Sequence, residues 1–299
     1  MTEQARDGYP DATGLLERSA AAFVGGVPED GPDNGFFGPA SVTWRTAADA
    51  STPVAGLRAL MIQALHPLAM AGVEQHSQWR QDPVGRLAAT SGYLATVSFG
   101  SRADAERVAA RVRRIHEHVT GVDEVTGRRY AASDPALLLW VHAALVDSTL
   151  VARELFGVPL TGALADDYVA EMVTAAELVG IPRDQVPATA AGLAGYLDSV
   201  RPVLVASPAA RESVGYLLDP PGLDADLAAI WQDIRAGVIG SLPDWARAMY
   251  GLPDEPLTPD RRTEISQALG VLDAVFLGQP GVLEARQRIA VRVRAARRA

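Results

Sequence analysis

Hydrophobic residues recur every three or four positions along most of this chain, which is the spacing of helices that bury one face. Between residues 51 and 81 the repeat is regular except at Pro67, which predicts a kink or a break into two helices. The same spacing predicts helices over residues 84–97 and 102–119. This part of the chain is therefore expected to be helical, with one sharp bend at the proline.

The second half of the chain carries clear signals for where helices begin and end. Asp134 followed by Pro135 is a typical helix start, and the apolar run after it predicts a long central helix that ends at Phe156. Residues 122–130 contain a Thr-Gly pair among polar residues and predict a turn or a small hairpin. Further helices are expected from residue 161 or 166 to 180, and over residues 187–200, 208–218, 224–239, 243–250, 259–277 and 281–298.

Strand signals are scarce, so the fold is expected to be all-α, a single large multi-helix domain over residues 41–299. Residues 1–40 are rich in Gly, Pro and Asp. They predict a mostly irregular and flexible arm with one short helix over residues 12–24.

The amino-acid composition excludes several kinds of chemistry. The 299 residues are 48% hydrophobic, which is enough for a substantial core. Cysteine and lysine are both absent, which excludes disulfides, iron–sulfur clusters, cysteine zinc sites and lysine Schiff bases. The net charge of −9 gives no support for nucleic-acid binding by the molecule as a whole.

Targeting signals are not evident in the sequence. The residues after Met1 lack the basic-then-apolar pattern of a secretory signal. The most apolar stretch, residues 136–151, is interrupted by His142 and Asp147, so no stretch is expected to span a bilayer. The sequence therefore predicts a cytoplasmic protein.

Three of the five histidines have distinct surroundings. His76 has polar neighbours and is expected at the surface or at a rim. His66 precedes Pro67 at the predicted kink, where it either faces a cavity or is a core residue hydrogen-bonded to a freed backbone carbonyl. His142 lies on the most apolar predicted helix and needs a metal, a carboxylate or a backbone carbonyl as its partner. Both a structural role and a ligand role remain open for His66 and His142.

His116 and His118 lie two residues apart on a predicted helix, so their side chains project about 200° apart. Only one of them can face the core. His116 lies beside Ile115 and follows Val112 by four residues, whereas His118 follows arginines. His116 is therefore the inward candidate, either as a structural residue or as a ligand.

Arg86 and Thr90 are four residues apart and therefore stack on one face of a predicted helix. A guanidinium beside a hydroxyl can bind a carboxylate or stabilise a dioxygen species. The alternative is a surface arginine paired with Asp82.

Common catalytic motifs are missing from the sequence. It contains no Gly-x-Gly-x-x-Gly at a strand–helix junction, no Walker A motif, no Gly-x-Ser-x-Gly and no His-Glu-x-x-His. A Glu-x-x-His motif of di-iron proteins is also absent, which argues against a ferritin-like site.

Seven short phrases, taken in order, carry more information than any one of them. They are Leu60-Met-Ile-Gln-Ala-Leu-His-Pro-Leu-Ala-Met-Ala-Gly-Val73, Asp82-Pro with Arg86-Leu-Ala-Ala-Thr90, Phe99-Gly100, Ile115-His-Glu-His-Val-Thr-Gly121, Gly127-Arg-Arg-Tyr-Ala-Ala-Ser-Asp-Pro135, Leu138-Leu-Trp-Val-His-Ala143 and Tyr168-Val-Ala-Glu171. Because these phrases occur in this order, the sequence over about residues 40–280 resembles the MpaB-type oxygenase family, of which the latex-clearing rubber oxygenases are distant members.

This resemblance implies an all-helical haem-pocket fold that holds a b-type haem through an axial histidine. By position, Arg86 and Thr90 match the family's Arg-x-x-x-Thr motif, and His116 matches the histidine expected to ligate the iron. His142 is the second choice for that ligand, and His66 is a further candidate for cofactor binding. Ala89 stands where the rubber oxygenases carry a lysine ligand, which argues against rubber cleavage.

The function that the resemblance implies is a haem-dependent oxygenase or oxidoreductase acting on an apolar small molecule, with alkenes and secondary metabolites as candidate substrates. A haem peroxidase-like enzyme that uses peroxide instead of O₂ is one alternative. A helical protein that binds haem or lipid without catalysis is another, and a histidine/carboxylate metalloprotein without porphyrin is a third.

Overall fold

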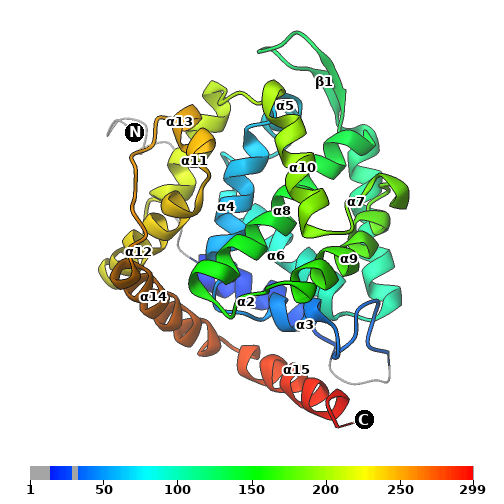
Figure 1. Cartoon of the computed structure of the whole chain (residues 1–299), viewed down its shortest axis with the longest axis vertical. Helices are drawn as coiled ribbons and strands as arrows, with labels where there is room; N and C mark the ends of the chain where they lie inside the picture. Colours follow the sequence, from blue (N-terminus) through cyan, green and yellow to red (C-terminus); the bar gives the residue numbers. More distant parts are fainter. Residues whose placement is uncertain (1–13, 29–32, 299) are drawn as a thin grey trace.

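The chain folds around one long apolar helix. In the computed structural model, which describes residues 14–28 and 33–298, helix α8 (Pro135–Phe156) lies at the centre of the molecule (Figure 1). It contacts helices α4, α9, α10, α12 and α14. Because neighbours surround α8, it is apolar around most of its circumference, as its sequence predicted.

The described residues form an all-α fold, with fourteen α-helices, two short 3-10 helices and one small hairpin. The remaining elements are α2 (Leu15–Gly26), α3 (Val42–Ala47), α4 (Thr52–Ala64), α5 (Pro67–His76), α6 (Pro83–Phe99), α7 (Arg102–His118), β1 (Thr120–Val122), β2 (Arg129–Ala131), α9 (Ala163–Leu178), η1 (Arg183–Gln185), α10 (Ala190–Val200), η2 (Arg201–Val203), α11 (Pro208–Leu218), α12 (Ala225–Ser241), α13 (Asp244–Tyr250), α14 (Pro259–Leu277) and α15 (Val282–Ala296).

Local sequence signals set the ends of several helices. Helix α11 covers residues 208–218 as predicted, and the Ser207 hydroxyl accepts a hydrogen bond from the Ala210 amide at 3.1 Å. Helix α14 covers residues 259–277, also as predicted, and is capped in the same way by Thr258. The predicted hairpin is present as β1 and β2, which pair antiparallel.

The break at Pro67 is sharp. Helices α4 and α5 meet at an angle of 101°, and His66 is the extended residue that precedes α5. The break exposes backbone carbonyls at the end of α4, and residues distant in the sequence satisfy them. Val205 donates its amide hydrogen to the Leu65 carbonyl at 2.8 Å, and Trp140 donates its indole N–H to the Gln63 carbonyl at 3.1 Å.

Helix α3, which was not predicted, begins with a local cap, because the Ser41 hydroxyl accepts a hydrogen bond from the Trp44 amide at 3.1 Å. A residue far along the chain completes the cap. The Glu171 carboxylate on α9 accepts hydrogen bonds from the backbone amides of Val42 (3.0 Å) and Thr43 (2.7 Å) and from the Thr43 hydroxyl (2.7 Å). These bonds satisfy amides at the start of α3 and favour its positive dipole end. Glu171 therefore has a structural role.

Part of the N-terminal segment is a packed helix. Helix α2 lies against α6 and α15, and Arg18 forms two hydrogen bonds of 2.8 Å with the Asp82 carboxylate. The short helix predicted over residues 12–24 is present from residue 15, and its first positions, 12–13, lie outside the described residues. The division of the chain at residues 40 and 41 stays a prediction.

A buried arginine joins three helices in the interior. Arg58 on α4 has 4% of its surface exposed. Its Nη1 donates to the Asp147 carboxylate and to the Ser148 hydroxyl on α8, both at 2.7 Å, and its Nε donates to the Ser241 carbonyl on α12 at 3.0 Å. This ion pair and its hydrogen bonds fix the position of α8 between α4 and α12.

The expectation that no stretch could span a bilayer was wrong on length and composition alone. Helix α8 is long and apolar enough to cross a membrane, since one neutral histidine and a few charges do not outweigh its leucines and valines. In the fold, however, α8 is packed against other helices on several sides. Its apolar surface therefore contributes to the protein core.

Candidate functional site

Helix α6 places Arg86, Thr90 and Tyr93 along one side. Arg86 and Tyr93 are seven residues apart, which is nearly two full turns, or about 10 Å along the axis. The helix begins after Asp82, whose carboxylate accepts a hydrogen bond from the Gly85 amide at 2.9 Å. The same carboxylate pairs with Arg18 and not with Arg86, so the surface pairing considered for Arg86 is not formed.

Arg86 is a half-buried cation without a carboxylate partner among the described residues. Its Nη1 donates a hydrogen bond to the Ser77 hydroxyl, and burial lowers the pKa of its guanidinium from the usual value. A cation in this state has unused donors and gains energy from a nearby negative charge. Arg86 is therefore suited to bind an anionic group.

Accessible residues lie between Arg86 and Tyr93. Ala89 and Thr90 are exposed, and the Thr90 hydroxyl donates to the Arg86 carbonyl at 3.0 Å, which leaves its oxygen lone pairs free to accept. Tyr93 is half-buried, and burial raises the pKa of its hydroxyl to about 12. Tyr93 was not predicted from the sequence, and the signal that could have found it is its spacing of three and seven residues from Thr90 and Arg86.

On helix α7 the two neighbouring histidines have opposite environments, as their spacing predicted. His118 is exposed, and its Nδ1 lies 2.7 Å from the Arg114 carbonyl. His116 is half-buried, its Nδ1 is buried without a hydrogen-bond partner, and burial lowers the pKa of its ring. Ile115, which was expected in the buried apolar face, is 52% exposed. His116 therefore lies beside an accessible apolar side chain.

His142, on the central helix, is partly accessible and has no hydrogen-bond partner in the described part of the chain. Burial nevertheless lowers the pKa of its ring to about 4, so the ring is neutral at pH 7. The adjacent Val141 is 40% exposed, and its carbonyl accepts a hydrogen bond of 2.9 Å from the Gln63 amide.

His66 is the most buried of the histidines, with 8% of its surface exposed. Its Nδ1 has no hydrogen-bond partner, and the two carbonyls freed by the helix break bond to Val205 and Trp140 instead. Its ring lies 6.0 Å from the Trp140 ring. Burial is the largest of the effects that lower the pKa of His66. The predicted hydrogen bond between His66 and a freed backbone carbonyl is therefore not present among the described residues.

The remaining histidine, His76, is exposed, as expected, and its Nε2 lies 3.0 Å from the Thr120 carbonyl. It therefore fastens α5 to the hairpin. His76 and His118 each have a ring nitrogen within hydrogen-bond distance of a backbone carbonyl, so both are poor candidates for ligating a metal or cofactor.

One hydrophobic cluster joins the helices that carry the candidate residues. Tyr93 on α6, Val108 on α7 and Tyr196 on α10 pack against a cluster that includes Val97 on α6 and Ala143 on α8. The helices bearing Arg86, His116 and His142 therefore share one packing unit. No hydrogen bond among the described residues connects these three side chains to one another.

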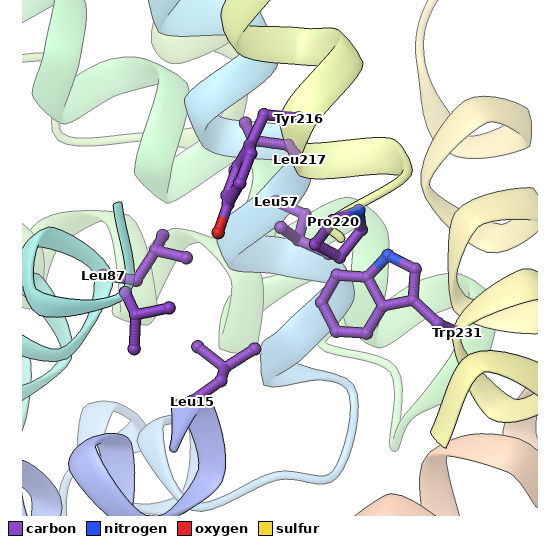
Figure 2. Close-up of a pocket in the computed structure, with 8 residues that line it drawn as sticks. Leu15, Leu57, Leu87, Tyr216, Leu217, Pro220 and Trp231 are labelled. Atoms are coloured by element: carbon purple, nitrogen blue, oxygen red, sulfur yellow. The ribbon is translucent and has the colours of Figure 1, made fainter. Parts of the chain in front are cut away.

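A small apolar pocket lies elsewhere, where helices α2, α4, α6, α11 and α12 converge (Figure 2). Its lining includes Leu15, Leu57, Leu87 and Trp231, and it contains none of the predicted site residues. Leu87 lies on a different side of α6 from the Arg86 and Tyr93 side chains. This pocket is therefore separate from the candidate site.

The low pKa of His142 predicts a loss of stability in acid. An unfolded histidine has a pKa near 6.5, so between pH 6.5 and 4 the unfolded chain binds more protons than the folded chain, and stability falls as the pH falls. For the cofactor-free protein, His142 should account for a loss of about 2 kcal/mol between pH 7 and pH 4.5. Urea unfolding, monitored by circular dichroism at both pH values, measures this loss in the free energy of unfolding.

The His142→Gln variant should lack this part of the pH dependence, whereas His118→Gln, in an exposed position, should retain it. An equal pH dependence for the wild type and His142→Gln would contradict the prediction.

Comparison with known proteins identifies the family. Residues 44–274 match the family described as the ER-bound oxygenase mpaB/B′ and rubber oxygenase catalytic domain. Searches of curated proteins and of solved structures returned no match. The matched span runs from α3 to α14 and includes every candidate residue above. The chain therefore belongs to the MpaB/rubber oxygenase catalytic-domain family.

Proposed function

We propose that this protein is a haem b-dependent oxygenase that acts on an apolar small molecule. The observation that carries the proposal is His116, a half-buried histidine with an unpartnered ring nitrogen beside an accessible isoleucine, in a chain of an oxygenase family. His142 is the second candidate for the axial position. His66 would border the cofactor from the break between α4 and α5.

The residues present fit a haem. Burial lowers the pKa of His116 and His142, so both rings are neutral at pH 7 and keep a lone pair for a metal. A porphyrin supplies four of the iron's ligands, so one imidazole from the protein is enough. Accessible Ile115 and Val141, adjacent to these histidines, suit an apolar macrocycle. When bound, the haem would supply the iron chemistry that activates O₂.

A metal site without porphyrin has less support. Among the described residues, no group of three or more His, Asp or Glu side chains is placed to hold a metal ion. A histidine/carboxylate site requires such a group because all its protein ligands must converge.

The chain's own residues have separate roles in this proposal. Arg86 binds negative charge, either on reacting oxygen or on a haem propionate, through the donors that Ser77 leaves free. Thr90 accepts or relays a hydrogen bond at the accessible part of the α6 face. Ala89 has no side chain that could ligate iron, so the substrate is proposed to be a small apolar molecule and not rubber.

The first test is an absorption spectrum of the haem-reconstituted protein. The wild type should show a Soret band, and His116→Ala should lower haem affinity by at least about 10–100-fold, because loss of an axial ligand costs no less than loss of its supporting contacts. His118→Ala is the matched control. Added imidazole should restore the band of His116→Gly.

A Soret band unchanged in His116→Ala and lost in His142→Ala would transfer the axial role to His142. A reconstituted wild type without any Soret band would reject the haem proposal. Turnover with O₂ and a reductant, compared with anaerobic turnover with peroxide, distinguishes the oxygenase from the peroxidase-like alternative. Haem binding without either turnover would favour a non-catalytic binding protein.

A further inference from the structure

The last two helices form a corner at the edge of the molecule (Figure 1). Helices α14 and α15 meet at an angle of 106°. The inner side of α15 is held to the body by Val282, Ala285 and Ile289, which are buried. Arg286 adds a 2.7 Å ion pair with Asp273 on α14. The corner is therefore a fixed part of the fold, with one side packed and one side free.

Both helices of the corner expose large apolar side chains. Val271 and Val275 on α14 are 50% and 42% exposed, and Leu283 and Val291 on α15 are 48% and 56% exposed. By length and composition the two helices together are apolar enough to cross a bilayer, but their bend prevents a straight span. Such a surface is suited to lie at an interface between water and an apolar phase.

Positive charge is concentrated on α15 and on the two residues that follow it. Six arginines and no acidic residue follow position 285, in a chain whose net charge is −9. Arg294 and Arg298 are exposed. Arg294 falls on the same helical face as Leu283 and Val291, because positions 283, 287, 291 and 294 recur at helical spacing, and Arg298 lies two residues beyond the end of α15. Neither has an acidic partner among the described residues. Glu284, exposed at the start of α15, is the one acidic side chain of this helix.

We propose that the α14–α15 corner docks the protein on the surface of an anionic lipid bilayer. The exposed valines and Leu283 would enter the boundary between headgroups and acyl chains, and the arginines would pair with lipid phosphates. A second copy of the chain is disfavoured as the occupant, because two arginine-rich faces would repel each other. Nucleic acid would leave the four apolar side chains without a partner. This inference is independent of the haem proposal.

Flotation with lipid vesicles tests the charge contribution. The full chain should bind vesicles of phosphatidylcholine and phosphatidylglycerol and should bind pure phosphatidylcholine vesicles much less. The Arg294→Gln/Arg298→Gln double variant should bind the anionic vesicles about 30-fold more weakly, from about 1 kcal/mol for each arginine near the membrane. The matched control Arg111→Gln/Arg129→Gln, which removes the same charge from exposed positions elsewhere, should bind as the wild type does.

The apolar contribution is tested separately. Leu283→Ser/Val291→Ser should reduce binding at least tenfold, whereas Val122→Ser/Val125→Ser, in the exposed hairpin at the opposite end of the molecule (Figure 1), should not. Far-UV circular dichroism and the urea unfolding midpoint are measured on every variant to exclude unfolding.

Two results would overturn the proposal. One is a wild type that does not float with anionic vesicles, or that binds both vesicle types equally. The other is light scattering that shows a dimer in solution which Leu283→Ser/Val291→Ser dissociates, since the corner would then be an interface between copies. A normal Soret band with no vesicle binding would reject the docking surface and leave the proposed function intact.

Discussion

Replacing Arg58 by alanine is expected to lower the free energy of unfolding by about 3–5 kcal/mol. The substitution leaves the Asp147 carboxylate without its ion pair, and it removes the donors to the Ser148 hydroxyl and the Ser241 carbonyl. A buried group that loses its partner costs its full desolvation energy. The effect should lie toward the lower end, because Asp147 is 26% exposed and water can hydrate it partly.

Urea unfolding of the purified variant measures this loss. The control is Arg201→Ala, which removes an exposed arginine whose partner, Asp198, is also exposed, and which should cost less than about 1 kcal/mol. The double variant Arg58→Met/Asp147→Asn should recover much of the stability, because it removes both charges and changes the side-chain volumes little. Equal losses for Arg58→Ala and Arg201→Ala would contradict the structural role of the buried ion pair.

Replacing Arg86 by alanine is expected to reduce oxygen consumption by about 10²–10³-fold, with an apolar alkene such as squalene as the probe. Arg86 is a half-buried cation with no acidic partner in the described residues. Its charge is therefore available to bind a ligand and is not used in an ion pair that stabilises the fold. Stability should change little, since the one hydrogen bond lost is that to Ser77. An oxygen electrode and the Soret absorbance, measured on the same samples, give both readouts.

Arg86→Lys distinguishes two roles for this charge. If Arg86 stabilises charge on the reacting oxygen, Arg86→Ala keeps its haem and loses turnover, and Arg86→Lys recovers part of the rate. If Arg86 holds a propionate, haem content falls in Arg86→Ala together with turnover. Arg111→Ala, on the exposed side of α7, is the matched control and should change neither readout. Turnover that is unchanged in Arg86→Ala would exclude Arg86 from the site.

The sequence predicted most helices closely because their signals are local. Ser207 and Thr258 cap the helices that follow them, and Pro67 breaks the chain within one residue of the expected place. The same locality explains the failures. Helix α3 is capped in part by Glu171, which lies 128 positions after Thr43, and no local pattern can show that contribution. Its other cap, Ser41, is a local signal that was not used.

Predictions about single side chains were correct where one helix decided the outcome. The spacing of His116 and His118 fixed their opposite directions, because both lie on α7. Ile115 was expected to be buried and is exposed, because burial depends on the neighbouring elements as well as on the spacing within α7. The pairing of Arg86 with Asp82, considered as an alternative, is not present. Asp82 binds Arg18 instead, which lies 64 positions earlier in the chain.

The sequence by itself determined the all-α class, the order and approximate ends of most helices, and the residues that carry the family resemblance. These follow from periodicity, capping and motif spacing, which act over a few residues. Only the tertiary structure decided which polar groups have partners. It joined Arg58 to Asp147 across 89 positions, and it left Arg86 without an acidic partner and His142 without a hydrogen bond among the described residues. The reason is physical, because desolvation and pairing depend on what packs nearby in space, which the local pattern of a helix does not contain.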